Sequence, residues 1–153
     1  MATPRFAAPS RVERAFNRFF GMLVGIGLGL RHNYLLEVRG RRTGRVYAAP
    51  VDVLDVDGTR YLVAPRGETQ WVRNARVAGR VSLKKGRREE YTVRELPDAE
   101  KPRLLKAYLD RFKTTVARYF PIPAGSPEAA FAAVAARYPV FELRAVGGPG
   151  PRR

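Results

Sequence analysis

The chain has 153 residues and no cysteine, with 29 lysines and arginines against 14 aspartates and glutamates, which gives a formal net charge of +15. This length fits one domain with its own hydrophobic core. The absence of cysteine excludes disulfides, thiolate metal sites and cysteine nucleophiles, and it is typical of a cytoplasmic protein. The positive charge favours an anionic partner, either a nucleic acid, an anionic lipid or an anionic cofactor.

The two ends of the chain have no regular pattern. Residues 1–10 contain two prolines and are predicted to be a disordered arm, and residues 147–153 are predicted to be a disordered tail. A single domain is therefore expected over residues 11–146. Within it, residues 19–30 are almost wholly apolar but fall short of the roughly 20 residues that cross a bilayer. Two interpretations stay open for this segment: a helix packed on the domain, or an interfacial helix in peripheral contact with a membrane.

The next segment predicts a series of antiparallel hairpins. Residues 35–39 and 46–55 have the composition of strands, and they lie on either side of a turn rich in arginine and glycine. Asp57-Gly58 is a strong hairpin signal. It joins the second strand to a third at residues 59–64.

The turn between the first two strands has the composition of an anion-binding loop. Gly40 and Gly44 can adopt positive φ without a Cβ penalty, so the backbone N–H groups between them can point toward a ligand. Arg41 and Arg42 add positive charge, and Thr43 adds a hydroxyl donor. In an arbitrary turn of so basic a chain these arginines would be solvated surface charges, so the motif alone is not specific.

A second anion-binding arrangement is predicted downstream. Residues 61–64 read as the end of a strand, Pro65-Arg66-Gly67 as its exit loop, and residues 68–78 as a helix. The first-turn N–H groups of that helix have no intrahelical acceptor and would point at a ligand beside Arg66. Two anion sites on one short stretch indicate a large phosphorylated ligand.

The rest of the chain predicts two more helices and the last strands. Residues 80–84 and 90–96 are expected to pair, and residues 140–145 to form a closing strand. Asp98 is the predicted N-cap of a long helix, and Pro127 the first residue of a shorter one. The predicted inward-facing residues of these helices are Leu104, Leu105, Tyr108, Leu109, Phe112, Val116, Ala130, Phe131, Val134 and Tyr138. Antiparallel hairpins with inserted helices predict an α+β barrel.

The order of these motifs resembles the deazaflavin-dependent nitroreductase family of the split β-barrel flavin-binding superfamily, over residues 34–96. That family carries a glycine, two basic residues, threonine or serine, and glycine between its first two strands. A proline follows, and then a loop of a small residue, a basic residue and glycine opens a helix that holds Trp and Asn. The matching residues are Gly40-Arg41-Arg42-Thr43-Gly44, Pro50, Ala64-Pro65-Arg66-Gly67, Trp71 and Asn74. In one departure, family members carry a second arginine on the strand leading to the proline, and this chain has Arg45 with Tyr47 nearby.

The resemblance implies a split β-barrel of about six antiparallel strands with flanking helices, and binding of the deazaflavin coenzyme F420, with FMN as a less favoured cofactor. The implied cofactor-binding residues are Arg41, Arg42, Thr43, Gly44, Pro50, Ala64, Pro65, Arg66, Gly67, Trp71 and Asn74. Trp71 keeps an alternative role in the core, and Asn74 an alternative role in satisfying a buried polar group. In family members a tyrosine from the long-helix region can face the substrate, which makes Tyr108 and Tyr119 candidates, although their spacing first indicates a core stripe.

Hydride transfer from a deazaflavin requires no protein nucleophile, in agreement with a chain that lacks cysteine and any catalytic dyad. The first hypothesis is an F420-dependent oxidoreductase that reduces a quinone-like, nitroaromatic or other unsaturated hydrophobic acceptor. The alternative is a non-catalytic binding module for deazaflavin, FMN or a lipid.

A nucleic-acid binder is disfavoured because the basic residues are scattered and no aromatic-basic interleaving marks a stacking surface. No metal site is expected, because the sole histidine, His32, has no partner at ligand spacing. The natural substrate and the oligomeric state, monomer or homodimer, are left open.

Overall fold

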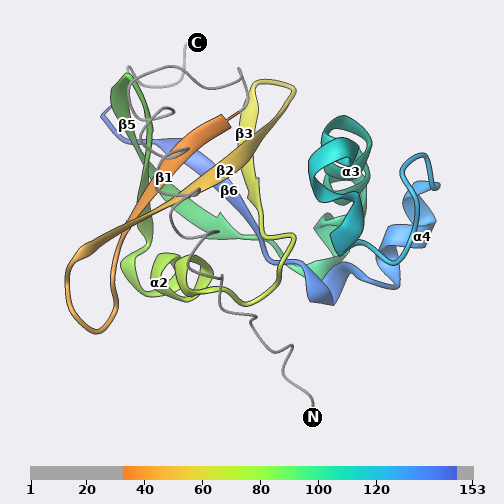
Figure 1. Ribbon diagram of the computed structural model, residues 1–153, viewed down its shortest axis with the longest axis horizontal. Helices are drawn as coiled ribbons and strands as arrows, with labels where there is room; N and C mark the ends of the chain where they lie inside the picture. The colour runs from red at the N-terminus through yellow and green to blue at the C-terminus, as the bar shows by residue number, and fades with distance from the viewer. Residues whose placement is uncertain (1–32, 148–153) are drawn as a thin grey trace.

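A computed structural model describes residues 33–147 of the chain. These residues form a closed barrel of antiparallel strands in the order β1-β2-β3-β6-β5-β4, and Figure 1 shows helices at one end of the barrel and along its side. The expected α+β split barrel with flanking helices is therefore confirmed. The predicted arm at residues 1–10, the apolar segment at residues 19–30, His32 and the tail after Gly147 lie outside the described residues.

All the predicted strands are present. They are β1 (Asn33–Arg39), β2 (Val46–Val56), β3 (Thr59–Val63), β4 (Arg80–Lys85), β5 (Arg87–Glu95) and β6 (Val140–Ala145). The helices are α2 (Gln70–Ala78), α3 (Pro102–Val116) and α4 (Glu128–Ala132), with short 3-10 helices η1 (Asp98–Glu100), η2 (Ala117–Tyr119) and η3 (Ala135–Arg137). None of the helices within residues 33–147 is long and apolar enough to cross a membrane.

Two hydrophobic clusters account for the packing of the barrel and its helices. The first lies inside the barrel and includes residues of α2, and the second joins β2, β3 and β6 to α3 and α4. β3 contributes to both, because side chains alternate across a strand: Leu62 belongs to the first cluster, and Tyr61 and Val63 belong to the second. The inward-facing residues predicted for the long helix are all buried in the second cluster.

Helix α2 begins at Gln70, two residues later than the predicted start at residue 68. The cause is the backbone of Thr69, which is extended (φ −77°, ψ 172°) and therefore outside a right-handed helix. Thr69 is the N-cap, and at the other end Gly79 (φ +69°) is the left-handed residue that terminates the helix.

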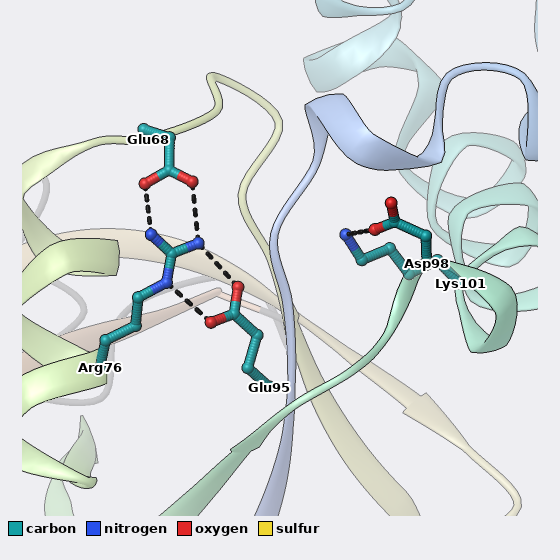
Figure 2. Close-up of polar contacts among 5 residues, drawn as sticks. All are labelled: Glu68, Arg76, Glu95, Asp98 and Lys101. Atoms are coloured by element: carbon teal, nitrogen blue, oxygen red, sulfur yellow. Dashed lines mark hydrogen bonds and ion pairs between the residues drawn. The ribbon is translucent and has the colours of Figure 1, made fainter.

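The starts of α3 and α4 also differ from the prediction. Asp98 is not an N-cap: its carboxylate accepts a hydrogen bond from Lys101 Nζ (2.7 Å), and it opens η1 (Figure 2). The Lys101 ammonium is buried and also donates to the Ala135 carbonyl (3.2 Å), so it joins the start of α3 to η3. Pro127 precedes α4 as its N-cap instead of being its first helical residue.

The β1–β2 hairpin projects beyond the rest of the barrel beside α2 (Figure 1, orange). β2 pairs with β1 over residues 46–52 and with β3 only from Val53 onward. Its other edge over residues 46–52 therefore has no strand partner within residues 33–147. Pro50 lies in this part of β2, where a residue without an N–H is compatible with a sheet edge.

Candidate functional site

The turn at the tip of the β1–β2 hairpin is closed by its own backbone. The Gly44 N–H donates to the Gly40 carbonyl (3.0 Å), and the Gly40 N–H donates to the Arg45 carbonyl (2.6 Å). Thr43 Oγ1 accepts the Arg45 N–H (3.2 Å). Gly44 has a φ of +72°, as expected for a glycine in this turn.

Gly40 is needed for a different reason from the one expected, because its φ is not positive. A Cβ at this position would lie 2.5 Å from Cε2 of Tyr47, so the tyrosine ring packs directly on the glycine backbone. The Tyr47 hydroxyl is 3.2 Å from Thr43 Oγ1. Tyr47 is therefore part of the turn, a role that its place in β2, seven residues after Gly40, does not indicate.

Arg41 connects this turn to helix α2. Its backbone N–H and its Nη1 both donate to Asn74 Oδ1 (3.1 and 2.8 Å), and Nη1 also donates to Gln70 Oε1 (3.0 Å). Asn74 is 5% exposed. Buried amide oxygens require donors, so this contact fixes the hairpin tip against α2. The polar-satisfaction role predicted for Asn74 is thus observed, with Arg41 as its partner, while Gln70 was not anticipated.

The neighbouring arginines have no such partners. Arg42 and Arg45 are exposed, and among residues 33–147 no carboxylate lies within ion-pair distance of either guanidinium. The same holds for Arg73 on α2. By contrast, arginines elsewhere on the barrel, such as Arg88 with Glu37, are paired. The hairpin tip and the adjacent helix thus present positive charge that the described residues do not neutralise, which attracts an anion.

The loop before α2 supplies the second predicted site. The Ala64 N–H donates to the Pro139 carbonyl (2.9 Å), the Gly67 N–H to the Ala64 carbonyl (3.1 Å), and the Thr69 N–H to the Gly67 carbonyl (2.8 Å). Arg66 is exposed at the turn of this loop. Thr69 is 8% exposed, and its hydroxyl is buried without a hydrogen-bond partner at the N-terminus of α2. An orphaned hydroxyl beside free helical N–H groups fits a site for a polar, anionic group.

Arg76, which sequence reasoning did not select, ties this loop to the barrel. It donates to both oxygens of Glu68 and to both oxygens of Glu95, with Nη2 of Arg76 at 2.8 Å from Glu68 Oε1 and 2.7 Å from Glu95 Oε2 (Figure 2). The hydrogen bonds from Arg76 lower the pKa of the Glu68 carboxyl. The bonds to Glu95 and then Glu68 raise the pKa of Arg76. No local pattern predicts this group, because Glu68 and Glu95 come from separate elements.

The aromatic candidates have different environments. Trp71 is half-buried, and its ring centroid lies 5.8 Å from that of Phe141 in the barrel core, which supports its alternative role in the core. Tyr108 is 2% exposed and packs edge-on against Phe112 at 5.3 Å, and its burial raises the pKa of its hydroxyl. Tyr108 therefore has no surface to present to a substrate and belongs to the core stripe. Tyr119 is half-buried, and its hydroxyl accepts a hydrogen bond from Arg118 Nη2 (2.8 Å).

A polar cluster closes the barrel end opposite α2. Arg60 Nη1 donates to the Tyr91 hydroxyl (2.7 Å) and to Glu89 (3.1 Å), and the Tyr91 hydroxyl donates to Glu89 (2.6 Å). Burial and the bond to Glu89 raise the pKa of Tyr91 to about 12. The side chains of Arg60, Glu89 and Tyr91 are thus bonded to one another, as expected for a polar network with a structural role.

A cavity of about 270 Å³ lies between the end of β5 and the start of α3. Its walls include Arg94, Arg103, Glu100, Glu128 and Glu142, and none of the predicted cofactor-binding residues contributes to it. Arg94 is already paired with Glu100 and Glu142. The cavity therefore has a charged, internally compensated lining that does not suit an apolar acceptor.

A closed antiparallel six-strand barrel with flanking helices defines a split-barrel protein. The chain belongs to the F420H(2)-dependent quinone reductase family, whose model matches residues 10–119. The family's description implies F420 as its cofactor. No match is found among curated proteins.

Solved structures with the same fold have diverse descriptions. An F420-H2 dependent reductase is 17% identical over 74% of this chain and 95% of its own, with a TM-score of 0.52. A chain described as a domain-swapped dimer is 19% identical over 88% of this chain and 94% of its own, with a TM-score of 0.56. The haem storage protein HutZ from Vibrio cholerae is 14% identical over 91% of this chain and 93% of its own, with a TM-score of 0.53. At these identities the likeness is one of fold alone.

Proposed function

We propose that this protein is an F420-dependent oxidoreductase that passes hydride from the reduced coenzyme to a quinone-like, nitroaromatic or other unsaturated hydrophobic acceptor. The observation that carries the proposal is the contact of Arg41 with Asn74 and Gln70. It brings the arginine turn and the N-terminal half of α2 into one basic surface. Membership of the F420H(2)-dependent quinone reductase family supports this assignment.

The proposed binding roles follow from the environment of each residue. Arg42 and Thr43 would hold the coenzyme's phosphate, since charged donors on an exposed turn suit a phosphate group. Gly44, whose N–H bonds to the Gly40 carbonyl, would shape the turn. Arg66 and the first N–H groups of α2 would hold a carboxylate of the oligoglutamate tail. Arg41 would act by holding the turn in place, because its guanidinium is already bonded to α2.

The other predicted residues shape the backbone around these donors. Pro50 lies on the free edge of β2, and Ala64, Pro65 and Gly67 form the loop that ends at α2. Trp71 would act through its packing on Phe141 at the base of the loop. Tyr119 is the remaining candidate for a residue that faces the substrate, because Tyr108 is buried in the core.

When bound, the reduced deazaflavin supplies the hydride and the protein needs no nucleophile of its own. The residues of this chain then have two tasks: to fix the anionic end of the coenzyme, and to let an apolar acceptor approach its ring. We place the protein in the cytoplasm, in agreement with a sequence that has no cysteine. A homodimer is compatible with the free edge of β2 over residues 46–52.

The proposal is tested by titrating the purified protein with F420 and, separately, with FMN, and by following the ligand's fluorescence. Reduced F420 is then mixed with a soluble quinone or a nitroaromatic, and its oxidation is followed by absorbance. We expect binding of F420, weaker binding of FMN, and oxidation that depends on the protein. Binding of F420 without turnover of any acceptor would support the non-catalytic binding module instead, and tight binding of FMN alone would overturn the cofactor assignment.

A further inference from the structure

The Arg76 guanidinium is shared by two carboxylates from different parts of the fold. Glu68 belongs to the loop before α2, and Glu95 is the last residue of β5. Each carboxylate receives two hydrogen bonds from Arg76, as Figure 2 shows. Bidentate arginine–carboxylate pairs fix the relative orientation of both groups, so this arrangement holds Glu68 against the end of β5.

The loop that contains Glu68 is joined to other elements by hydrogen bonds near both of its ends. The Gly67 and Thr69 N–H groups bond to carbonyls within the loop itself, and these bonds shape the loop without attaching it. Attachment comes from the Ala64 N–H, which bonds to Pro139 at the start of the loop. Near the end of the loop, the attachment comes from the hydrogen bonds that Arg76 donates to Glu68. The exposed Arg66 lies between these two points.

The charge of Glu68 is also relevant, because this carboxylate lies one residue before the N-cap of α2. A free carboxylate there would oppose the binding of an anion at the helix N-terminus. Arg76, which it shares with Glu95, offsets part of this charge, and the lowered pKa of Glu68 reflects that pairing. Arg76 itself is fully engaged and has no role as a direct ligand.

We propose that Arg76 is a positioning residue of the anion site formed by Arg66 and the N-terminus of α2. It fixes the loop of residues 64–69 against β5 and offsets part of the charge of Glu68. This inference rests on the proposed function, because it assigns the anion at this site to the tail of the coenzyme. It predicts that the loss of the Arg76 contacts weakens binding of the anionic part of the coenzyme and leaves binding of its ring unaffected.

The variant Arg76→Lys keeps the positive charge but cannot donate two N–H groups to each of two carboxylates. The matched control is Arg88→Lys, which removes a bidentate pair with Glu37. Arg88 is seven residues before Glu95 on β5, roughly 23 Å along the strand. Both variants are compared with the wild type by amide hydrogen exchange, and by binding of F420 and of the deazaflavin riboside that lacks phosphate and tail.

We expect faster exchange of the Gly67 and Thr69 amides in Arg76→Lys, about tenfold weaker binding of F420, and unchanged binding of the riboside. In steady-state assays the KM for F420 should rise while kcat stays constant. Arg88→Lys should match the wild type in all these measurements. A purely structural role for Arg76 would lower the melting temperature and weaken both ligands equally.

The inference would be overturned by unchanged exchange of the Gly67 and Thr69 amides, or by unchanged affinity for F420 despite faster exchange. Equal weakening of F420 and riboside would overturn it as well. If the wild type bound no F420 at all, the proposed function would fall. The exchange rates would then still decide whether Arg76 holds the loop. If Arg76→Lys did not fold, Glu95→Gln would be used, because it weakens the link of Arg76 to β5 while leaving the pair of Arg76 with Glu68.

Discussion

Arg41 and Arg42 are adjacent at the tip of the hairpin, but only Arg41 has its guanidinium bonded to side chains of α2. We therefore expect different effects from the same truncation. Arg42→Ala should weaken F420 binding by about 1.5–3 kcal/mol, the usual cost of a lost charged hydrogen bond, with no change in melting temperature. Arg41→Ala should weaken binding and also lower the free energy of unfolding by about 1 kcal/mol.

Fluorescence titration and thermal unfolding of both variants measure these effects. Lys113→Ala serves as the control, since Lys113 is an exposed cation on α3. Equal loss of stability in Arg41→Ala and Arg42→Ala would contradict the distinction. Retained F420 affinity in Arg42→Ala would remove this residue from the phosphate site.

The Thr69 hydroxyl offers a test of the site at the start of α2. It is buried without a hydrogen-bond partner, so the isosteric change Thr69→Val removes no bond in the free protein. We expect the melting temperature to stay constant or to rise, because an unsatisfied buried hydroxyl is unfavourable. Binding of F420 should weaken if the hydroxyl bonds to the ligand. A lower melting temperature would show instead that the hydroxyl caps the helix.

For single residues, the sequence predicts which residue types form the site but not which side chains they hydrogen-bond to. The pattern of glycine, arginine and threonine indicates an anion-binding turn, yet it treats Arg41 and Arg42 alike. The difference depends on Asn74, which lies 33 residues away and reaches the turn only after the barrel has closed. Arg76 on α2 was missed for the same reason, because its partner Glu95 lies on strand β5.

Among the elements, the β1–β2 hairpin depends on the packing of Tyr47 against Gly40. Gly40→Ala would place a Cβ 2.5 Å from the Tyr47 ring and displace it, with loss of the contact between Tyr47 and Thr43. Because Tyr47 is exposed, its ring can move aside, and the expected cost is that of the lost contact with Thr43, about 0.5–1.5 kcal/mol. The double variant Gly40→Ala/Tyr47→Ala should recover part of that loss relative to the sum of the single variants, because the clash requires both side chains.

Thermal unfolding of the two single variants and the double variant measures the coupling. Gly44→Ala is the comparison, because it meets no atom within 4 Å and its cost of about 1–2 kcal/mol comes from its φ of +72° alone. This cost should not change when Tyr47 is also replaced. Additive effects of the Gly40 and Tyr47 changes would show that the ring does not contact the glycine.

β2 and β3 were predicted more accurately than the start of α3, and both outcomes have physical causes. Alternating apolar residues and Asp57-Gly58 are local signals, and they place β2 and β3 to within a residue. Helix starts depend on competing contacts that are not local. Asp98 has the residue type of an N-cap, but its carboxylate accepts a hydrogen bond from the buried Lys101 ammonium. Lys101 also donates to the Ala135 carbonyl, which is distant in the sequence.

For the whole molecule, the described residues carry part of the chain's net charge of +15, and that part is distributed unevenly. Most carboxylates are paired with arginines or lysines around the barrel and α3, as in Arg94 with Glu142. The hairpin from Arg39 to Pro50 contains four arginines and no acidic residue. This basic hairpin lies where the sequence predicted the cofactor, beside α2.

This distribution predicts that F420 binding depends on ionic strength. The Debye length is about 8 Å at physiological ionic strength and about 3 Å at 1 M salt, so the exposed Arg42 and Arg66 would be strongly screened. The dissociation constant for F420 should rise as potassium chloride is added, and Arg42→Ala should show a weaker dependence than the wild type because one of the screened charges is gone. The riboside without phosphate and tail should bind equally well at every salt concentration, since it carries no anionic group for these arginines. An F420 affinity that is constant from low to high salt would mean that the basic hairpin does not hold the coenzyme, and the anion sites at both Arg42 and Arg66 would then have to be abandoned.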